Sequence, residues 1–420
     1  MSVPGRDGRR AGPRLVLALL LLAYIFNFLD RQILGILAQP IKADLNLSDT
    51  EFGAIGGLAF ALLYSLLGVP LAYLADRTSR SAVIAGSLAV WSAFTALCGI
   101  ATGYWQLFLC RVGVGVGEAG GVAPSYALIA DYFPAERRAR ALAIYSLGVP
   151  IGLSAGTLLG AYIASAVDWR TAFLVMGIAG VLIAPLLRYF VRDLPRRADG
   201  GSVPVARVFG ILASKPAFWL LAVAAGSSSL VGYGLALWLP SIVMRSFRAD
   251  LIATGQFLGS LLLIGGTAGV LAGGWFADRL GSANRAWYAR LPAIAWLVTV
   301  PTYVAGLMAP SLSMAWPLLL IPNALNILWL APVTTAVQHL VSREMRATAS
   351  ACFLLIINLI GLGLGPLLIG RLSDVFSASY GADSLRNAAI AFLGFYIVAA
   401  AVILLASGWL RKGWVDDLAQ

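Results

Sequence analysis

Two carboxylates and one guanidinium lie inside long apolar stretches of the sequence, and their residue types suit proton chemistry. Asp30 lies in the first apolar stretch, and Arg111 and Glu118 share a later one. A charge at the centre of a membrane-spanning helix costs about 2.5 to 3.5 kcal/mol, so each of these charges needs a function or a partner. Burial and a nearby guanidinium act in opposite directions on the proton affinity of a carboxylate. Asp30 and Glu118 are therefore predicted to exchange protons, with Arg111 adjusting their affinity.

The heights of these side chains along their helices indicate which of them meet. Asp30 is expected about 12 Å from the outer end of its helix, and Arg111 about 10 Å from the outer end of its own. The similar depths predict an ion pair between Asp30 and Arg111, which would relieve the cost of burying either charge. Glu118 lies two turns beyond Arg111 on the same face and has no obvious partner, and the role of Arg31 stays open. The alternative is a fixed ion pair that only orients two helices.

The elements that must hold these charges are membrane-spanning helices. Of the 420 residues, 60% are hydrophobic and 12% are charged, which is more apolar surface than one soluble core can use. A bilayer core about 30 Å thick requires roughly 20 apolar residues per helix. The apolar runs predict an all-α integral membrane protein with about twelve transmembrane helices. These are expected near residues 14–38, 51–75, 81–103, 104–131, 140–165, 170–190, 216–244, 251–276, 287–307, 312–340, 345–372 and 385–411.

The residues between these runs predict the orientation and the division of the chain. Most Arg and Lys residues lie in alternate loops, so the positive-inside rule predicts that both termini are cytoplasmic. This distribution accounts for the net charge of +11 without a nucleic-acid partner. One long polar connection, residues 191–215, is predicted to be a cytoplasmic linker between two six-helix bundles, residues 1–190 and 216–420.

Short motifs recur in the two predicted bundles. A Leu-Ala-Asp-Arg segment containing Asp76 and Arg77 follows the second helix, and a Phe-Ala-Asp-Arg segment containing Asp278 and Arg279 follows the eighth. Four further residue pairs share one separation along the chain: Pro124 and Pro332, Glu136 and Glu344, Arg138 and Arg346, Ala139 and Ala347. These correspondences predict two repeats related by an axis along the membrane normal, that is, two pseudo-symmetric bundles.

These motifs resemble those of the major facilitator superfamily over essentially the whole chain. The loop after the second helix is similar to the family pattern G-x-L-A-D-R-x-G-R, with Ala72 and Ser79 in place of its glycines. The helix-four pattern R-x-x-x-G-x-G-x-A is matched by Arg111, Gly115, Gly117 and Ala119. Residues 27–32 and 47–51 resemble the spinster-type branch. The resemblance implies the major facilitator fold, alternating access, and a lipid-like cargo of the sphingosine-phosphate or lysolipid type.

The resemblance also implies a conformational latch at the cytoplasmic ends of the helices. Its residues are Asp76, Arg77, Arg80, Asp131, Asp278 and Arg279. An aspartate in such a loop can cap a neighbouring helix at its N-terminus, where about half a positive charge resides. In the family this contact joins the two bundles, so it is expected to stabilise an outward-open state. The alternative is solvated loop charge that serves only to orient the chain.

Polar side chains in the middle of the C-terminal helices predict the cargo pocket. The candidates are Ser228, Tyr233, Asn323, Asn326, Trp329 and Asn358. Buried amides and hydroxyls need partners, which a cavity supplies, and aromatic neighbours suit an amphipathic guest. Serine and asparagine also bridge helices, so packing is the alternative. A separate group is predicted to permit kinks and close helix packing: Gly148, Pro150, Gly152, Gly365 and Pro366.

These features predict a secondary active transporter, coupled to protons, that moves an amphipathic lipid-like solute. The alternative is a proton-driven exporter of drugs or small organic metabolites. The sequence has no Walker motif and no nucleophile or metal-ligand spacing, so no enzyme activity, cofactor or metal is expected. Arg111 is the cation expected to meet a phosphate-bearing cargo. The expected partners are cargo, protons and membrane lipids, and a monomer in a bacterial inner membrane is expected.

Overall fold

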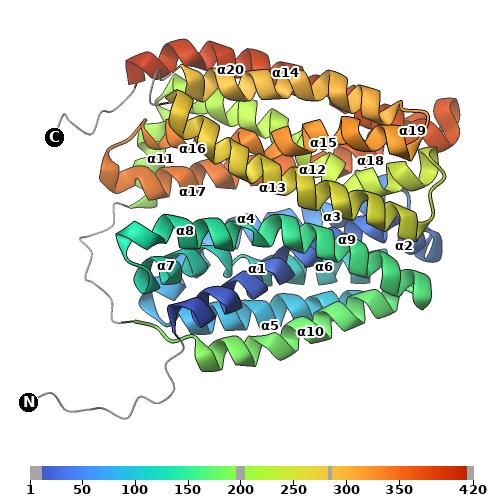
Figure 1. Ribbon diagram of the computed structural model, residues 1–420, viewed down its shortest axis with the longest axis horizontal. Helices are drawn as coiled ribbons and strands as arrows, with labels where there is room; N and C mark the ends of the chain where they lie inside the picture. Colours follow the sequence, from blue (N-terminus) through green and yellow to red (C-terminus); the bar gives the residue numbers. More distant parts are fainter. Residues whose placement is uncertain (1–11, 195–203, 282–285, 414–420) are drawn as a thin grey trace, which may run out of the picture.

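A computed structural model describes residues 12–194, 204–281 and 286–413, and Figure 1 shows helices packed side by side in two layers. The helices before the linker, called the N half, are α1 (Pro13–Ile36), α2 (Ala38–Leu45), α3 (Asp49–Gly56), α4 (Leu58–Arg77), α5 (Arg80–Cys98), α6 (Tyr104–Glu118), α7 (Val122–Tyr132), α8 (Ala135–Ser146), α9 (Gly148–Ala166) and α10 (Trp169–Phe190). The linker contains α11 (Val205–Ala213).

The helices after the linker form the second layer, called the C half. They are α12 (Pro216–Ser246), α13 (Leu251–Gly281), α14 (Trp287–Leu307), α15 (Leu312–Leu328), α16 (Leu330–Gln338), α17 (Arg346–Ile357), the π-helix η2 (Asn358–Leu364), α18 (Gly365–Tyr380), α19 (Ser384–Phe392) and α20 (Gly394–Gly413). Two short 3₁₀ turns, η1 (Arg343–Met345) and η3 (Gly381–Asp383), precede α17 and α19.

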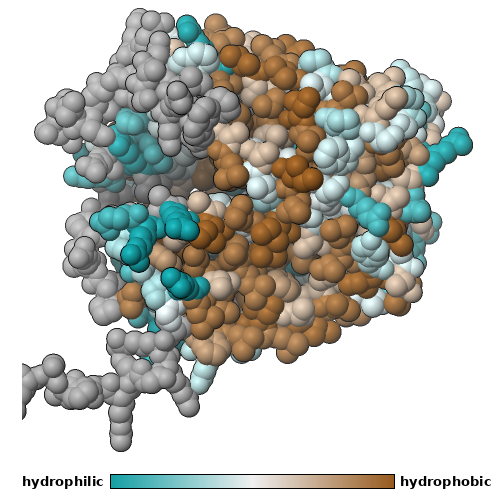
Figure 2. All heavy atoms as spheres, in the orientation of Figure 1, coloured by the Kyte–Doolittle hydropathy of each residue, from teal (hydrophilic) through white to brown (hydrophobic). Residues whose placement is uncertain are grey.

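The expected all-helical membrane architecture is confirmed. Among the described residues, eleven segments are long and apolar enough to cross a membrane, and the last, Thr348–Leu410, has 63 residues. At 1.5 Å per residue it is about three times as long as a bilayer core is thick, and the chain reverses within it at Gly381, where φ is 53°. This segment therefore supplies the eleventh and twelfth crossings. Figure 2 shows hydrophobic side chains over the middle of one face and hydrophilic side chains towards its ends.

Several crossings are broken helices, which hydropathy alone does not predict. The expected helix 51–75 is two helices, α3 and α4, because the chain breaks at Gly57 (φ −107°, ψ −82°). The eleventh crossing changes from α-helix to π-helix at Asn358 and returns to α-helix at Gly365. Neither α2 nor α11 is expected from the sequence, because both are shorter than a membrane span.

Glycines bring the helix backbones close together. A Cβ at Gly152 would lie 2.5 Å from the Ile25 carbonyl oxygen, so α9 and α1 pack backbone against backbone. A Cβ at Gly57 would lie 2.7 Å from the carbonyl oxygen of Gly363, which joins α4 to the π-helix of the other half. Only glycine permits these separations, because any side chain would clash with main-chain atoms.

The two ends of the helix stack differ in how the halves are connected. At the end where α10 stops and α12 starts, called the α11 end, the linker joins the halves (Figure 1). At the opposite end, called the α2 end, α3 packs against α18 and α2 contacts α12 (Figure 1). Hydrogen bonds between the halves collect at the α2 end, among them those from Arg245 to Asp49 and from Gln256 to Tyr162.

Candidate functional site

The three buried charges predicted for proton exchange lie within the N half, on α1 and α6. Asp30 and Glu118 are fully buried, and Arg111 is 2% exposed. Glu118 is the last residue of α6, where Gly120 and Gly121 separate this helix from α7. The break places a buried carboxylate at an interruption of the helix in the middle of a crossing. This is the combination that membrane transport proteins reserve for a functional site rather than for packing.

The expected ion pair between Asp30 and Arg111 is wrong. Among the described residues, the buried ion pair of this region joins Arg31 to Glu118, with 2.8 Å between Nε and Oε2. Arg111 instead places its guanidinium 5.4 Å from the centre of the Phe60 ring. Spacing along a helix gives the height of a residue but only roughly its direction, and consecutive residues point about 100° apart. Arg31 therefore meets Glu118 on α6, and the adjacent Asp30 does not pair with Arg111.

The Arg31 side chain is enclosed by aromatic rings. Its guanidinium carbon lies 5.2 Å from the ring centre of Phe28, 4.8 Å from that of Phe60 and 4.6 Å from that of Tyr64. Aromatic faces attract cations, and this attraction strengthens when water is excluded. The side chain retains 15% exposure. Arg31 is thus a stabilised cation whose side chain stays partly exposed.

Polar atoms without a described hydrogen-bond partner surround these charges. They include both carboxylate oxygens of Asp30, Oε1 of Glu118, Nε and Nη1 of Arg111, both amide atoms of Asn27, Trp91 Nε1 and Thr95 Oγ1. A buried polar group that lacks a partner costs roughly 1 to 3 kcal/mol. A protein that needed only stability would not concentrate such groups in one place. The concentration favours a role in binding protons or a polar ligand.

A cavity of about 90 Å³ lies between the halves, with walls from both. Its polar lining consists of Gln32 from α1, Tyr303 from α14, and Asn323 and Asn326 from α15. The Asn326 amide oxygen also accepts a hydrogen bond of 3.0 Å from the Tyr396 hydroxyl. Most of the remaining lining is aliphatic or proline. The cavity thus presents uncharged hydrogen-bonding groups in an apolar wall.

Two of the six predicted pocket residues, Asn323 and Asn326, line this cavity. The other four do not. The Tyr233 hydroxyl lies 3.4 Å from the Asn358 amide oxygen, to which it donates a hydrogen bond. Ser228 is fully buried in α12, and the Trp329 ring lies 6.3 Å from the Trp296 ring. The sequence signal for these four is the same as for the lining residues, because mid-helix polarity does not show which neighbour a side chain faces.

The cavity also includes residues for which the sequence predicts another role or none. Pro150, expected only to kink and pack α9, lines it, and Gln32 and Tyr303 were not predicted. The signal that could have found Gln32 is its position one turn of α1 beyond Phe28, in a stretch that already carries two charges.

The other members of the packing group lie at helix contacts. A Cβ at Gly148 would meet the Tyr24 ring at 2.9 Å. A Cβ at Gly365 would meet the Leu230 carbonyl oxygen at 2.3 Å, and the Pro366 carbonyl accepts a 2.8 Å hydrogen bond from Trp238 Nε1.

The residues of the expected latch form ion pairs within the N half. Arg80 at the start of α5 binds Asp76 on α4 at 2.7 Å and Asp131 on α7 at 2.6 Å. The Arg77 guanidinium lies over the Tyr73 ring at 4.2 Å. Asp278 and Arg279 fall outside the residues whose side chains the structure describes. The described ion pairs therefore tie α4, α5 and α7 together at the α11 end.

A further carboxylate binds the start of α5 at the same end of the helix stack. Asp193, beyond the end of α10, accepts hydrogen bonds from the Ser79 hydroxyl and from the Ser81 backbone N–H, the latter at 3.1 Å. Burial raises the pKa of the Asp193 carboxyl, but these hydrogen bonds outweigh burial, so the pKa falls below its usual range.

Within the described residues, no group of three or more His, Cys, Asp or Glu side chains is arranged to hold a metal ion. The three cysteines, Cys98, Cys110 and Cys352, are free.

Comparison with known proteins gives consistent matches over most of the chain. The family model of the Major Facilitator Superfamily matches residues 20–366. The chain is 34% identical over 415 residues to an "MFS-type efflux pump" of Mycolicibacterium smegmatis, covering 97% of this chain and 96% of that protein. It is 28% identical over 397 residues to the human "Protein spinster homolog 1", covering 88% of this chain and 74% of that protein.

Two solved structures of a bacterial homolog of the human lysosomal transporter spinster, both inward-facing, are also similar. The unoccupied structure matches with a TM-score of 0.86 at 30% identity, covering 96% of this chain and 99% of that chain. The occupied structure matches with a TM-score of 0.85 at 30% identity, covering 98% and 100%.

The Arg31–Glu118 pair leads to a stability prediction. Glu118→Ala leaves the Arg31 cation buried without its carboxylate, and breaking a buried pair costs about 3 to 5 kcal/mol. We expect a clear fall in the thermal unfolding temperature of the purified protein. Arg31→Met combined with Glu118→Ala removes both charges and should recover part of the loss. A double variant that unfolds lower by the sum of the two single losses would show that the pair is not coupled.

Proposed function

The chain belongs to the Major Facilitator Superfamily of membrane transporters, and from this premise we propose that it couples the movement of protons to that of an amphipathic, lipid-like solute by alternating access. The observation that carries the proposal is that one helix, α1, holds the buried Asp30 and also contributes Gln32 to a largely apolar cavity that both halves line. A buried titratable group and a site shared by two repeats provide what such a cycle requires: a proton site and a cargo site that respond to one motion.

Asp30 and Glu118 have different roles in this proposal. Glu118 is held as a carboxylate by Arg31 at 2.8 Å, whereas Asp30 has no described hydrogen-bond partner. A buried carboxyl without a partner is more easily accommodated as the neutral acid. Asp30 is therefore the group that carries a proton while the Arg31–Glu118 pair is intact. Protonation of Glu118 would remove its charge and release Arg31. The protonation state of Glu118 would therefore change how α1 contacts α6.

Arg31 is also better placed than Arg111 to meet an anionic cargo. It retains 15% exposure, whereas Arg111 is 2% exposed and lies against Phe60. A cargo phosphate that binds Arg31 would compete with Glu118 for the same guanidinium, and the displaced carboxylate would then take up a proton. Competition for one cation would couple cargo binding to protonation. This replaces Arg111 with Arg31 as the proposed phosphate contact.

The lining of the cavity supports an amphipathic cargo, and the cavity is too small to enclose such a cargo completely in this state. Its volume of about 90 Å³ is smaller than the roughly 300 to 1,000 Å³ of typical ligand pockets. Amides at Gln32, Asn323 and Asn326 suit a polar group, while the aliphatic wall suits a chain. The similarity to spinster proteins supports a lipid of the sphingosine-phosphate or lysolipid type.

The second candidate is a proton-driven exporter of drugs or small organic metabolites. The observation that favours it is the 34% identity, over nearly the whole chain, to the efflux pump of Mycolicibacterium smegmatis. A small cavity without charged walls suits such molecules equally well.

The protein is a multi-pass membrane protein, and its proposed orientation follows from its charges. The loops at the α11 end carry most of the Arg residues, so this end is assigned to the cytoplasm together with both termini. The hydrogen bonds between the halves at the α2 end, and the similarity to two inward-facing structures, support an inward-facing state. A monomer in a bacterial inner membrane completes the proposal.

Proton coupling is tested by uptake into proteoliposomes under an imposed pH gradient, with a fluorescent lysophospholipid as the probe. Asp30→Asn and Glu118→Gln cannot exchange protons at these positions, so we expect their uptake to fall to the rate measured without a gradient. Asp168→Asn is the matched control, because this exposed residue caps α10 through a 2.7 Å hydrogen bond from the Thr171 N–H, a cap that asparagine also provides. Gradient-driven uptake that is unaltered in both site variants would contradict proton coupling.

The two cargo classes are separated by mass spectrometry of the purified protein. We expect a lysolipid or sphingoid phosphate to be enriched over the bulk lipid of the same membrane, and this enrichment to weaken in an Asn323→Leu variant. Bound lipid with the bulk composition would instead favour the exporter.

A further inference from the structure

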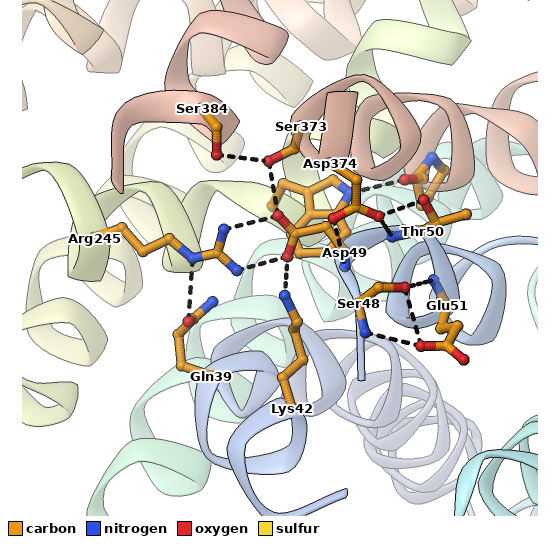
Figure 3. Close-up of polar contacts among 12 residues, drawn as sticks. Gln39, Lys42, Ser48, Asp49, Thr50, Glu51, Arg245, Ser373, Asp374 and Ser384 are labelled. Carbon is orange, nitrogen blue, oxygen red and sulfur yellow. Dashed lines mark hydrogen bonds and ion pairs between the residues drawn. The ribbon is translucent and has the colours of Figure 1, made fainter. Parts of the chain in front are cut away.

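One carboxylate at the α2 end is bound from both halves at once. Asp49, the first residue of α3, is 4% exposed. Arg245 of α12 approaches it in a two-pronged contact, with Nη1 at 2.8 Å from Oδ2 and Nη2 at 2.6 Å from Oδ1. The Lys42 ammonium of α2 donates to the same carboxylate, and the Ser373 hydroxyl of α18 donates to it at 2.7 Å (Figure 3). The N half supplies Asp49 and Lys42, and the C half supplies Arg245 and Ser373.

A second carboxylate makes the reciprocal connection. Asp374 of α18 accepts hydrogen bonds from the backbone N–H groups of Asp49 at 3.1 Å and Thr50 at 2.8 Å, and from the Thr50 hydroxyl (Figure 3). These are N–H groups in the first turn of α3, where the helix has no internal acceptors. A residue of the C half thus caps a helix of the N half, and the helix dipole strengthens this contact.

The main chains of the two halves also touch at this point. A Cβ at Gly370 of α18 would lie 2.3 Å from the Asp49 carbonyl oxygen, and a Cβ at Gly53 of α3 would lie 2.4 Å from the Pro366 carbonyl oxygen. The carboxylate contacts therefore sit on a close backbone seam between α3 and α18. Separation of the halves at the α2 end must break all of these contacts.

The negative charge of Asp49 determines whether Lys42 and Arg245 hold the two halves together or repel each other. Lys42 and Arg245 are both cations, they come from different halves, and they meet at one carboxylate. Lys42 lies outside the membrane-spanning segments. Burial lowers the pKa of its ammonium and the Arg245 guanidinium lowers it further, while Asp49 acts in the opposite direction. Without the Asp49 charge, Lys42 and Arg245 would be like charges facing each other across the seam.

We propose that Asp49, with Arg245 and Asp374, forms a clamp that keeps the α2 end shut and must release before cargo can pass that end. The clamp rests on alternating access, but not on the identity of the cargo or on proton coupling. Its residues lie at the opposite end of the helices from the Arg80 ion pairs. The clamp therefore stabilises closure of the α2 end and has no direct contact with the α11 end.

The test measures the separation of the halves at the α2 end with spin labels. Cysteines replace Val167 of the N half, which is 67% exposed, and the exposed Ala378 of the C half, in a background where Cys98, Cys110 and Cys352 are alanine. Pulsed electron resonance in nanodiscs then gives the distribution of distances between the labels.

We expect Asp49→Asn to increase the population with long distances about tenfold, the change that follows from losing one charge-assisted contact. Asp374→Ala should shift the distribution in the same direction. Lys42→Met in the Asp49→Asn background should reverse part of the shift, because it removes one of the two facing cations. Asp44→Asn is the matched control, since Asp44 pairs with Arg170 within the N half, and it should match the unaltered protein.

Distance distributions that are unchanged in both Asp49→Asn and Asp374→Ala would overturn the clamp. A shift in the control equal to that in Asp49→Asn would also overturn it, because any lost charge at this end would then have the same effect. Gradient-driven uptake is a separate measurement. If the distances shift as expected but neither the unaltered protein nor any variant shows gradient-driven uptake, the proposed proton coupling fails and the clamp stands.

Discussion

The cost of burying charge in an apolar membrane is the constraint on which this structure depends. Charged side chains are sparse in the crossings, and those that occur are gathered where other residues can compensate for them. Arg31 meets Glu118 and three aromatic rings, and Asp30 and Arg111 lie within the same group of helices. The N half therefore contains a polar interior, whereas the cavity walls that meet the C half are largely uncharged.

The same constraint explains how the halves are joined. Within the bilayer they meet through small residues and backbone, as at Gly57 and Gly363. Such apolar contacts can slide past each other without leaving a buried charge unpaired. Charged contacts between the halves are confined to the α2 end, where Asp49 meets Arg245, at least among the side chains that the structure describes. An assembly with movable packing in the middle and a charged closure at one end is suited to a rocking motion.

The sequence was sufficient for the fold because hydropathy and repeated motifs report on length and order along the chain. The sequence also predicted that Asp30, Arg111 and Glu118 are charged side chains inside the helix bundle, and all three are buried. It predicted a pair between Asp30 and Arg111 and no partner for Glu118, because helical spacing gives height rather than direction around the axis. In the structure Arg31, the neighbour of Asp30, binds Glu118. The Asp49–Arg245 contact joins residues far apart in the sequence, and neither carries a local signal for the other. Mid-helix polarity identified two cavity residues and four that face other helices, since orientation depends on packing.

Coupling of proton movement to cargo movement is the central claim of this account. Its most direct test is the internal pH of proteoliposomes that contain the unaltered protein and an encapsulated pH dye, recorded while a fluorescent lysophospholipid is added outside without any imposed gradient. If the two movements are coupled, the lipid enters and the internal pH changes in step with it, whereas liposomes without protein show neither signal. Entry of the lipid at the same rate with a constant internal pH would contradict the coupling, and absence of entry would contradict the lipid cargo.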